Sequence, residues 1–370
     1  MRLARIVHLT SAHAVFDTRI FYRECGSLVR EGYEVTLIAP HERDEVVNGV
    51  KIKAIAKPKG RLSRMTCTVW RVYREALRQK ADVYHFHDPE LIGAGTLLKL
   101  TTNSRVVFDV HENYPLVALR RSWIPRLLRP LAQFSVWLIL RLFLPFFDAI
   151  VCATESIEAS FPHNCKITLK NFADLDVTSA DDPHANNMLV YAGVIFGERG
   201  LCQFLEAFLL MNQVMPVRLR LVGVRSRDIS LEEQLRRCPP GMIEVLPWMK
   251  HEEALQWISG STLGLGLDLP LPGSDGPPTK YFEYMALGLP IVSADLPLMR
   301  KIVEEAGCGI VVDFRNPQEV ADKIVELLRD PHRIEMMRQR GLQAFIKHYH
   351  WRTQVPKLLA LYRGLLDAGN

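Results

Sequence analysis

The residues best suited to chemistry gather around one expected helix start, in the segment 275–290. Asp275 precedes the helix, Lys280 lies in its first turn, and Glu283 follows about one turn later. Free backbone N–H groups and the positive end of the helix dipole attract an anion there, and the ammonium group adds a full positive charge. This spacing indicates a diphosphate site, in which Glu283 could bind ribose hydroxyls and Asp275 sugar hydroxyls. The alternative is an acidic helix start with an ordinary surface lysine.

Proline and glycine mark the two ends of this helix. Pro277 and Pro278 are tolerated in a first helical turn, because the missing N–H would have had no partner within the helix. Gly288 can end the helix in a left-handed conformation. We therefore expect a short helix whose first turn, including Thr279, is open to a ligand.

A second anion site is predicted in the segment 190–200, which reads as a strand, a glycine-bearing turn and a helix start. Gly193 ends the strand, and Arg199 lies at the helix start, where it could share the charge of the same diphosphate. Arg225, at the end of another expected strand, is a further basic candidate. Trp248 also follows a strand and could flank a nucleobase, although an aromatic residue there is as often part of the packing.

Polar side chains also end two strands expected in the first half of the chain. His111 follows the strand 106–110, a position that favours a hydrogen bond to substrate over a purely structural role. His85 and His87 point the same way on another strand, so a metal site is conceivable, but no third ligand follows at a known metal spacing. We therefore interpret His87 and Asp88 as the polar lining of a cleft.

Composition limits the classes of protein. The length of 370 residues suggests two domains, and 48% hydrophobic with 24% charged residues describes a globular chain with a sizeable core. A net charge of +5, from 46 basic and 41 acidic residues, is too balanced for a nucleic-acid binder. Seven scattered cysteines, with no Cys-x-x-Cys pair, indicate reduced thiols. The start of the chain lacks the apolar run of a signal peptide, so we expect a cytoplasmic protein.

Short apolar runs rich in β-branched residues alternate with helical patterns along the whole chain. This alternation is typical of parallel sheets covered by helices on both faces. A polar stretch at 174–187 divides the pattern into two sets. We expect an α/β protein of two Rossmann-like, doubly wound domains, 1–175 and 186–347, that face a central cleft.

The segment 117–147 predicts a membrane-surface helix. Arg141 and Pro145 interrupt its apolar run before it reaches the roughly 20 residues needed to span a bilayer. A helix lying in the interface fits better, and the arginines would be drawn to anionic lipid. The alternative is a long helix that covers the first domain's sheet. The apolar residues at helical spacing are Leu127, Leu131, Phe134, Leu138 and Leu142, and the arginines that precede the main run are Arg120, Arg121, Arg126 and Arg129.

Taken together, these segments resemble the family 4 retaining glycosyltransferases, which have the GT-B architecture. The resemblance covers nearly the whole chain. In two places the chain departs from the family's pattern: Asp275 stands where the family has a glutamate, and Val194 where a basic residue is usual. The most specific segments are 16–24, 32–38, 87–90, 109–112, 193–200 and 280–290.

The resemblance implies transfer of a sugar, with retention, from a UDP- or GDP-type nucleotide sugar to a glycan or lipid-linked acceptor, without a metal or other cofactor. The setting it implies is cell-surface polysaccharide or glycolipid biosynthesis. Segment 348–370 is similar to the family's last helix, which packs back on the N-terminal domain, the acceptor-binding one. The donor side would comprise Arg199 and Lys280 on the diphosphate, Glu283 on the ribose, Asp275 on the sugar hydroxyls, and Gly193, Arg225, Trp248 and Thr279. His111 would contact the reacting sugar, and the acceptor side would comprise Asp17, Arg19, His87, Asp88 and Glu112.

Other functions remain open at this point. A sugar-nucleotide epimerase of the same fold would isomerise the donor and need no acceptor. A non-catalytic, membrane-associated assembly partner would keep the fold and lose the activity, as the departures at Asp275 and Val194 would allow. A hydrolase would need two carboxylates about 5–10 Å apart astride a glycosidic bond, whereas Asp275 and Glu283 are interpreted as binding groups. Nucleotide release in the presence of candidate acceptors separates these functions.

Overall fold

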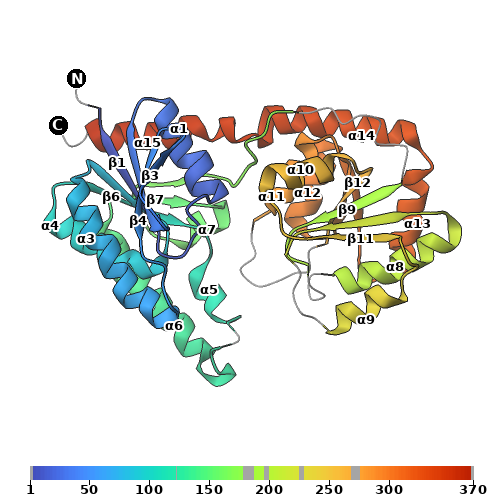
Figure 1. Cartoon of the computed structure of the whole chain (residues 1–370), viewed down its shortest axis with the longest axis horizontal. Coiled ribbons are helices and arrows are strands. Elements are labelled where there is room, and N and C mark those ends of the chain that lie inside the picture. The colour runs from blue at the N-terminus through green and yellow to red at the C-terminus, as the bar shows by residue number, and fades with distance from the viewer. Residues whose placement is uncertain are drawn as a thin grey trace. The chain divides into compact units, whose positions relative to one another are not determined.

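A computed structural model describes residues 3–121, 123–177, 187–195, 200–224, 229–267 and 276–367 (Figure 1). The chain forms two compact units, one of Met1–Asn171 with Gln354–Asn370 and one that begins at Phe172 and ends at Thr353. Each unit is built on a sheet of mainly parallel strands covered by helices, so the expected α/β class is confirmed. The last helix of the chain belongs to the first unit.

The first unit contains, among its described residues, one eight-stranded sheet in the order β3-β4-β2-β1-β5-β6-β7-β8. Neighbouring strands run parallel, apart from the antiparallel pair β3 and β4. The strands are β1 (Arg5–Leu9), β2 (Glu34–Pro40), β3 (Glu45–Val47), β4 (Val50–Ile55), β5 (Val83–Phe86), β6 (Arg105–Val110), β7 (Ala149–Cys152) and β8 (Lys166–Thr168).

Helices cover both faces of this sheet. One side carries α3, α4 and α6, and the other carries α1 and the C-terminal helix α15 (Figure 1). The helical segments are η1 (Thr18–Cys25), α1 (Gly26–Arg30), α2 (Arg61–Ser63), η2 (Arg64–Thr68), α3 (Val69–Gln79), η3 (Pro89–Leu91), α4 (Ile92–Thr101), α5 (Tyr114–Ala118), η4 (Arg126–Leu128), α6 (Arg129–Phe143), η5 (Leu144–Phe146), α7 (Glu155–Ser160) and α15 (Val355–Asp367).

The second unit has a sheet of parallel strands in the order β11-β10-β9-β12-β13-β14, counted over its described residues. The strands are β9 (Met188–Ala192), β10 (Arg218–Val222), β11 (Ile243–Leu246), β12 (Leu263–Gly266), β13 (Ile291–Ala294) and β14 (Gly309–Val312). The helices are α8 (Leu201–Val214), α9 (Ile229–Arg237), α10 (His251–Ser259), α11 (Thr279–Ala286), α12 (Pro297–Ala306), α13 (Pro317–Leu328), α14 (Pro331–Ala344), η8 (Phe345–Tyr349) and η9 (Trp351–Thr353).

Helix α11 carries three of the predicted site residues, Thr279, Lys280 and Glu283, and its start differs slightly from the expectation. It begins at Thr279 with Pro278 as its N-cap, so both prolines precede the helix instead of lying in its first turn. Their fixed φ angle and missing N–H suit the residues just before a helix equally well. Gly288 has a φ of +69°, which confirms the predicted left-handed end.

Two tyrosines hold α11 against the sheet. Tyr281 and Tyr284 are fully buried against β12, at positions where the strand has glycine. A Cβ atom on Gly264 would overlap the ring of Tyr284, and one on Gly266 would overlap Tyr281. The absence of side chains at Gly264 and Gly266 therefore sets how closely α11 approaches the sheet.

We expect Gly264→Ala to lower the free energy of unfolding by about 1–3 kcal/mol, because overpacking forces the Tyr284 ring out of its place. Urea unfolding measures the change. Gly260→Ala is the matched control, since the nearest atom to its added Cβ would be an Arg220 nitrogen at 3.8 Å. Equal stability of the two variants would show that α11 does not depend on this close approach.

Candidate active site

Three neighbouring strands of the first unit, β1, β5 and β6, end in polar residues at one edge of the sheet. Parallel strands bring their carboxyl ends to the same edge, and ligands of such sheets bind there. The predicted residues His87, Asp88 and His111 are therefore brought together. With them come the strand residues His8, His85 and Asp109 and the loop residues Thr10, Ser11 and His13.

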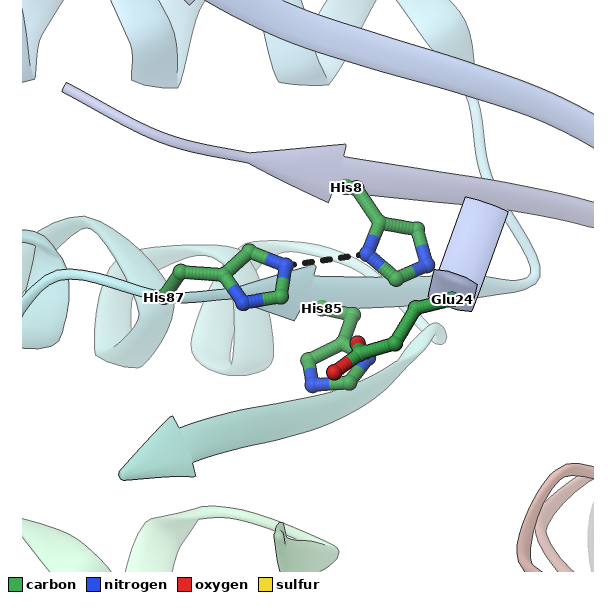
Figure 2. A group of neighbouring side chains, drawn as sticks. All are labelled: His8, Glu24, His85 and His87. Carbon is green, nitrogen blue, oxygen red and sulfur yellow. Dashed lines mark hydrogen bonds and ion pairs between the residues drawn. The ribbon is translucent and has the colours of Figure 1, made fainter. Parts of the chain in front are cut away.

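Three buried histidines lie side by side on β1 and β5 (Figure 2). His8 faces His85 in the strand register, and Nδ1 of His8 lies 2.9 Å from Nε2 of His87. Burial lowers the pKa of His87 to about 4, although the nearby Asp109 carboxylate opposes this. Burial and the neighbouring imidazoles lower the pKa of His8 and of His85 well below the ordinary value. All three rings are therefore neutral near pH 7.

Figure 2 also shows why a metal site has to be considered at this point. Donor atoms of His8, Glu24, His85 and His87 lie within 4.8 Å of one another. No third ligand follows His85 and His87 in the sequence, but the fold brings two further ligand groups close to them, His8 from β1 and Glu24 from η1. However, His8 and His87 already hydrogen-bond to each other, and the guanidinium of Arg19 lies 3.0 Å from Glu24. The geometry is that of a hydrogen-bonded network, and the absence of a metal stays a prediction.

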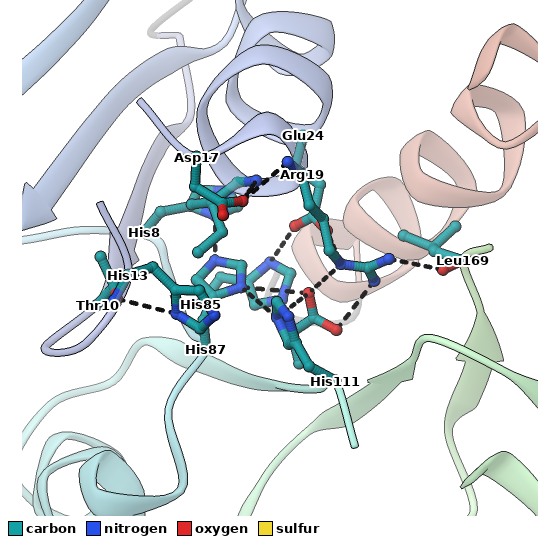
Figure 3. Close-up of polar contacts among 12 residues, drawn as sticks. His8, Thr10, His13, Asp17, Arg19, Glu24, His85, His87, His111 and Leu169 are labelled. Atoms are coloured by element: carbon teal, nitrogen blue, oxygen red, sulfur yellow. Dashed lines mark hydrogen bonds and ion pairs between the residues drawn. The ribbon is translucent and has the colours of Figure 1, made fainter. Parts of the chain in front are cut away.

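Arg19 and Asp109 form a buried, two-bonded ion pair. Nε of Arg19 lies 2.9 Å from Oδ2 of Asp109, and Nη2 lies 3.0 Å from Oδ1. A third donor, Nη1, binds the carbonyl oxygen of Leu169 at 2.8 Å (Figure 3). Arg19 was predicted on the acceptor side, but these bonds occupy its guanidinium group inside the fold.

The single charge of Arg19 lies between two buried carboxylates. Burial would raise the pKa of Asp109, but Arg19 and His111 outweigh it and hold this pKa well below the ordinary value. Glu24 faces the same guanidinium, yet burial and the charge of Asp109 raise its pKa well above the ordinary value. Asp109 is therefore the carboxylate that the guanidinium holds ionised, and Glu24 is the one of the two that binds a proton more readily.

His111 is oriented directly by this carboxylate. Its Nε2 lies 3.1 Å from Oδ2 of Asp109 and 3.3 Å from Nδ1 of His87. The side chain is 18% exposed, whereas Asp109 is fully buried. A fixed Nε2–H donor leaves Nδ1 as the atom that a ligand could meet. This arrangement suits a residue that binds a reacting group.

Asp88 organises the loop after β1. Its Oδ2 accepts hydrogen bonds from the hydroxyl of Thr10 at 2.7 Å and the backbone N–H of Ser11 at 2.6 Å, and Oδ1 lies 2.9 Å from His13. Burial would raise the pKa of Asp88, but the bonds from His13, Ser11 and Thr10 hold it far below the ordinary value. Burial would likewise lower the pKa of His13, and the bond to Asp88 raises it instead.

The two remaining acceptor-side predictions differ in setting. Asp17 is the N-cap of η1, and its carboxylate accepts from the backbone N–H groups of Arg19 and Ile20 at 2.8 and 2.9 Å. Such a cap stabilises a helix start. Glu112 is exposed, 3.8 Å from Arg121. Asp17 therefore has a structural task, while Glu112 lies open to solvent beside His111.

In the second unit, Lys280 and Glu283 lie in the first turns of α11. Lys280 is buried, and its Nζ lies 4.2 Å from the ring centroid of Tyr191. Oε1 of Glu283 lies 2.8 Å from Nε2 of His251, at the start of α10. Thr279 opens the helix. A buried cation and a carboxylate one turn apart thus stand at a helix N-terminus, as the spacing predicts.

Gly193 and Trp248 follow strands β9 and β11 of the same sheet. Gly193 has a φ of +137°, and its carbonyl oxygen lies where a Cβ atom on Gly223 would fall, so two backbones approach closely there. Trp248 is 72% exposed, which makes a packing role the weaker explanation. The predicted residues Asp275, Arg199 and Arg225 lie outside the described residues.

Several polar residues that contact the candidates were not predicted: Asp109, Glu24, His8, His13 and Tyr362 in the network of the first unit, and His251 beside Glu283 in the second. One signal was present in the sequence. His8 and Asp109 interrupt strands that are otherwise almost wholly apolar, and a buried polar group needs a partner. The partners themselves lie far away in the chain, so no local pattern identifies them.

The segment 117–147 contains the one described helix that is long and apolar enough to cross a membrane. Arg126–Phe146 is a continuous helical run of 21 residues. Its most apolar stretch of 18 residues has a mean hydropathy of 1.5, and 11% of that stretch is buried. Arg141 and Pro145 therefore do not shorten the run as expected, because η4, α6 and η5 follow one another without a break. Leu127 is 94% exposed, and half or more of Leu131, Phe134 and Leu142 is exposed.

We expect Asp88→Asn to lower the pKa of His13, because burial is then opposed only by the charges of Asp17 and Asp109, which contribute less than Asp88 does. An NMR titration of the His13 ring measures it. In the parent, the raised pKa means that the pair stabilises the fold fully below the unfolded pKa of about 6.5, and this contribution is lost as the pH rises through the folded pKa. His13→Gln, followed by urea unfolding, should remove that part of the pH dependence. If the His13 ring titrated identically in the parent and in Asp88→Asn, the pairing of His13 with Asp88 would be contradicted.

Two family descriptions match the chain in succession. Residues 18–170 match Glycosyltransferase Family 4, and residues 186–330 match Glycosyl transferases group 1. The chain is 27% identical over 201 residues to D-inositol 3-phosphate glycosyltransferase 1 of Catenulispora acidiphila, which covers 50% of this chain and 46% of that protein. It is 24% identical over 139 residues to phosphatidyl-myo-inositol mannosyltransferase of Mycobacterium leprae, covering 38% and 37%. The matches thus span less than half the length of these relatives.

Solved structures match over the whole chain. Sucrose-phosphate synthase from Thermosynechococcus elongatus superposes with a TM-score of 0.73 at 15% identity, covering 99% of this chain and all of that one. Alr3699/HepE from Anabaena, in complex with UDP and glucose, gives 0.74 at 13% identity, covering 98% and 100%. This likeness establishes the GT-B fold. Because both family domains occur in order on that fold, the chain belongs to the family 4, group 1 glycosyltransferases.

Proposed function

We propose that this protein transfers a sugar, with retention of anomeric configuration, from a UDP- or GDP-type nucleotide sugar to a glycan or lipid-linked acceptor. The observation that carries the proposal is the start of α11, where buried Lys280 and the carboxylate of Glu283 stand one turn apart at a helix N-terminus. Helix N-termini bind phosphate groups, and a carboxylate can accept from both hydroxyls of a ribose. A nucleoside diphosphate offers both groups.

The chemistry proposed here places the charge changes on the donor. The bond between the sugar's anomeric carbon and the diphosphate oxygen breaks, a bond to the acceptor oxygen forms on the same face, and a phosphate oxygen takes the acceptor's proton. Lys280 and Arg199 stabilise the growing negative charge, which is the role a metal ion would otherwise have. Glu283 orients the ribose, and His111 and Asp275 bind the sugar. Positioning and electrostatics, without a protein nucleophile, supply the catalysis.

Known relatives support this choice of substrates. HepE was solved with UDP and glucose, and one curated relative is named for transfer of mannose to phosphatidyl-myo-inositol. We extend both to this chain: a nucleoside diphosphate as leaving group and a lipid-linked or glycan acceptor, in cell-surface polysaccharide or glycolipid synthesis. Release of nucleoside diphosphate only when an acceptor is present would support transfer. Isomerised donor without an acceptor would indicate an epimerase, and neither product would indicate a non-catalytic assembly partner.

We expect Lys280→Ala and Arg199→Ala each to weaken binding of a nucleoside diphosphate by about 1.5–3 kcal/mol, since each change removes a charge-assisted bond to phosphate. Isothermal titration calorimetry with UDP and with GDP measures the affinity. Lys301→Ala removes the same charge from exposed α12 and serves as the control. If both site variants bind like the control, the diphosphate does not lie at the start of α11.

We further propose that the first unit works on the inner face of the cell membrane, bound through the segment 117–147. This segment has five arginines and no acidic residue. Arg61 stacks on Trp123 at 5.2 Å, which extends the apolar and basic surface to α2. A helix that crossed the bilayer would separate β6 from β7, yet Asp109 and Val151 are paired in one sheet. The helix therefore lies in the interface, with its apolar side chains in the lipid.

We expect the protein to float with anionic vesicles at low salt and to be released as salt rises, because each arginine near such a surface contributes about 1 kcal/mol. Replacing Arg120, Arg121, Arg126 and Arg129 by Ser should abolish flotation. The control replaces Arg236, Arg237, Lys301 and Lys347 by Ser, which removes the same charge from exposed positions of the second unit. No flotation of the parent, or equal loss in both variants, would overturn the proposal.

A further inference from the structure

A chain of hydrogen bonds runs from the C-terminal helix to the candidate catalytic histidine. The hydroxyl of Tyr362 on α15 lies 3.3 Å from Nε2 of His8 and 2.6 Å from Nδ1 of His85. Nδ1 of His8 lies 2.9 Å from Nε2 of His87, whose Nδ1 lies 3.2 Å from Oδ2 of Asp109. The same carboxylate oxygen lies 3.1 Å from Nε2 of His111. Tyr362, His8 and His87 are all buried.

The ionised carboxylate decides the direction of every bond in this chain. Asp109 can only accept, so Nδ1 of His87 must carry a proton and Nε2 must accept. Nδ1 of His8 is then the donor to His87, and its own Nε2 must accept. The hydroxyl of Tyr362 therefore donates to His8, and its oxygen accepts from Nδ1–H of His85. One proton arrangement satisfies all these contacts.

The charges agree with this arrangement. A neutral imidazole has one donor and one acceptor nitrogen, and burial keeps His8, His85 and His87 neutral by lowering the pKa of each ring. Burial raises the pKa of Tyr362 well above its ordinary value, so the phenol keeps the proton that it donates. Nε2 of His85, left as a bare acceptor, has no hydrogen-bond partner among the described residues. A bare acceptor there is what the chain of donors requires.

We propose that Tyr362 is a positioning residue: its hydroxyl group fixes the tautomers of His8 and His87, and thereby holds Asp109 and His111 in their catalytic orientation. Without the phenol, Nε2 of His8 loses its donor, and the ring is free to take the opposite tautomer or to turn. The bond to His87 then breaks or reverses, and Asp109 loses one of its donors. The effect on catalysis through His111 rests on the function proposed above, whereas the assignment of the tautomers is independent of that function.

The test compares the full-length parent with Tyr362→Phe, both labelled with ¹⁵N-histidine. Long-range ¹H–¹⁵N spectra identify which ring nitrogen carries the proton. In the parent, His8, His85 and His87 should all be protonated on Nδ1, and in the variant the signals of His8 and His85 should shift toward mixed tautomers. Turnover of sugar transfer should fall about tenfold, the equivalent of one hydrogen bond, with the KM for the donor unchanged.

Tyr33→Phe is the matched control. The centroid of the Tyr33 ring lies 6.3 Å from that of Tyr362, and among the described residues no hydrogen bond joins Tyr33 to the histidines. Its spectra and turnover should match the parent. A parent His8 or His87 protonated on Nε2, or unchanged tautomers in Tyr362→Phe, would overturn the proposal. Changed tautomers with unchanged turnover would overturn the link to His111. The spectra of the unliganded protein decide the tautomers even if no transfer is found.

Discussion

The ion pair between Arg19 and Asp109 is the interaction on which the polar network of the first unit depends. Asp109 lies on β6, one of the three strands that end in polar residues, and it accepts hydrogen bonds from Arg19, His87 and His111. Removing one partner of such a buried pair typically costs about 3–5 kcal/mol, because a charge is then left without compensation. The same carboxylate also orients the rings of His87 and His111.

The same charge sets the protonation of its neighbours. With Arg19 paired to Asp109, burial and the charge of Asp109 raise the pKa of Glu24, and burial keeps the histidines beyond it neutral by lowering their pKa values. A positively charged side chain from η1, a negatively charged one from β6 and neutral rings from β1 and β5 thus form one closed network (Figure 3). In contrast, the second unit presents a buried cation at a helix start, which suits an anionic ligand. The two units therefore differ in their polar groups: the first holds a closed hydrogen-bonded network, and the second holds a buried lysine at a helix N-terminus.

Local sequence patterns predicted those parts of the molecule that depend on local physics. The α/β alternation, the helix that begins near Lys280, and the left-handed end at Gly288 all follow from periodicity or backbone preference. The partners of Asp109 and Asp88 did not follow, because Arg19 is 90 residues from Asp109 and Ser11 is 77 from Asp88. Only the order of strands in the sheet brings them together. The family resemblance placed Arg19 and Asp17 on the acceptor side, but their side chains form hydrogen bonds within the fold.

The return of the chain to the first unit has a consequence for its synthesis. Strands β1 and β5 leave the ribosome early, but the helix that covers His8 and His85 is made after the whole second unit. Until α15 is released, the face that holds these histidines is open to water, and their rings can take protons that the finished core excludes. The first unit therefore starts to fold first and is completed last, and a nascent chain that stops before residue 354 exposes polar groups that the finished fold encloses.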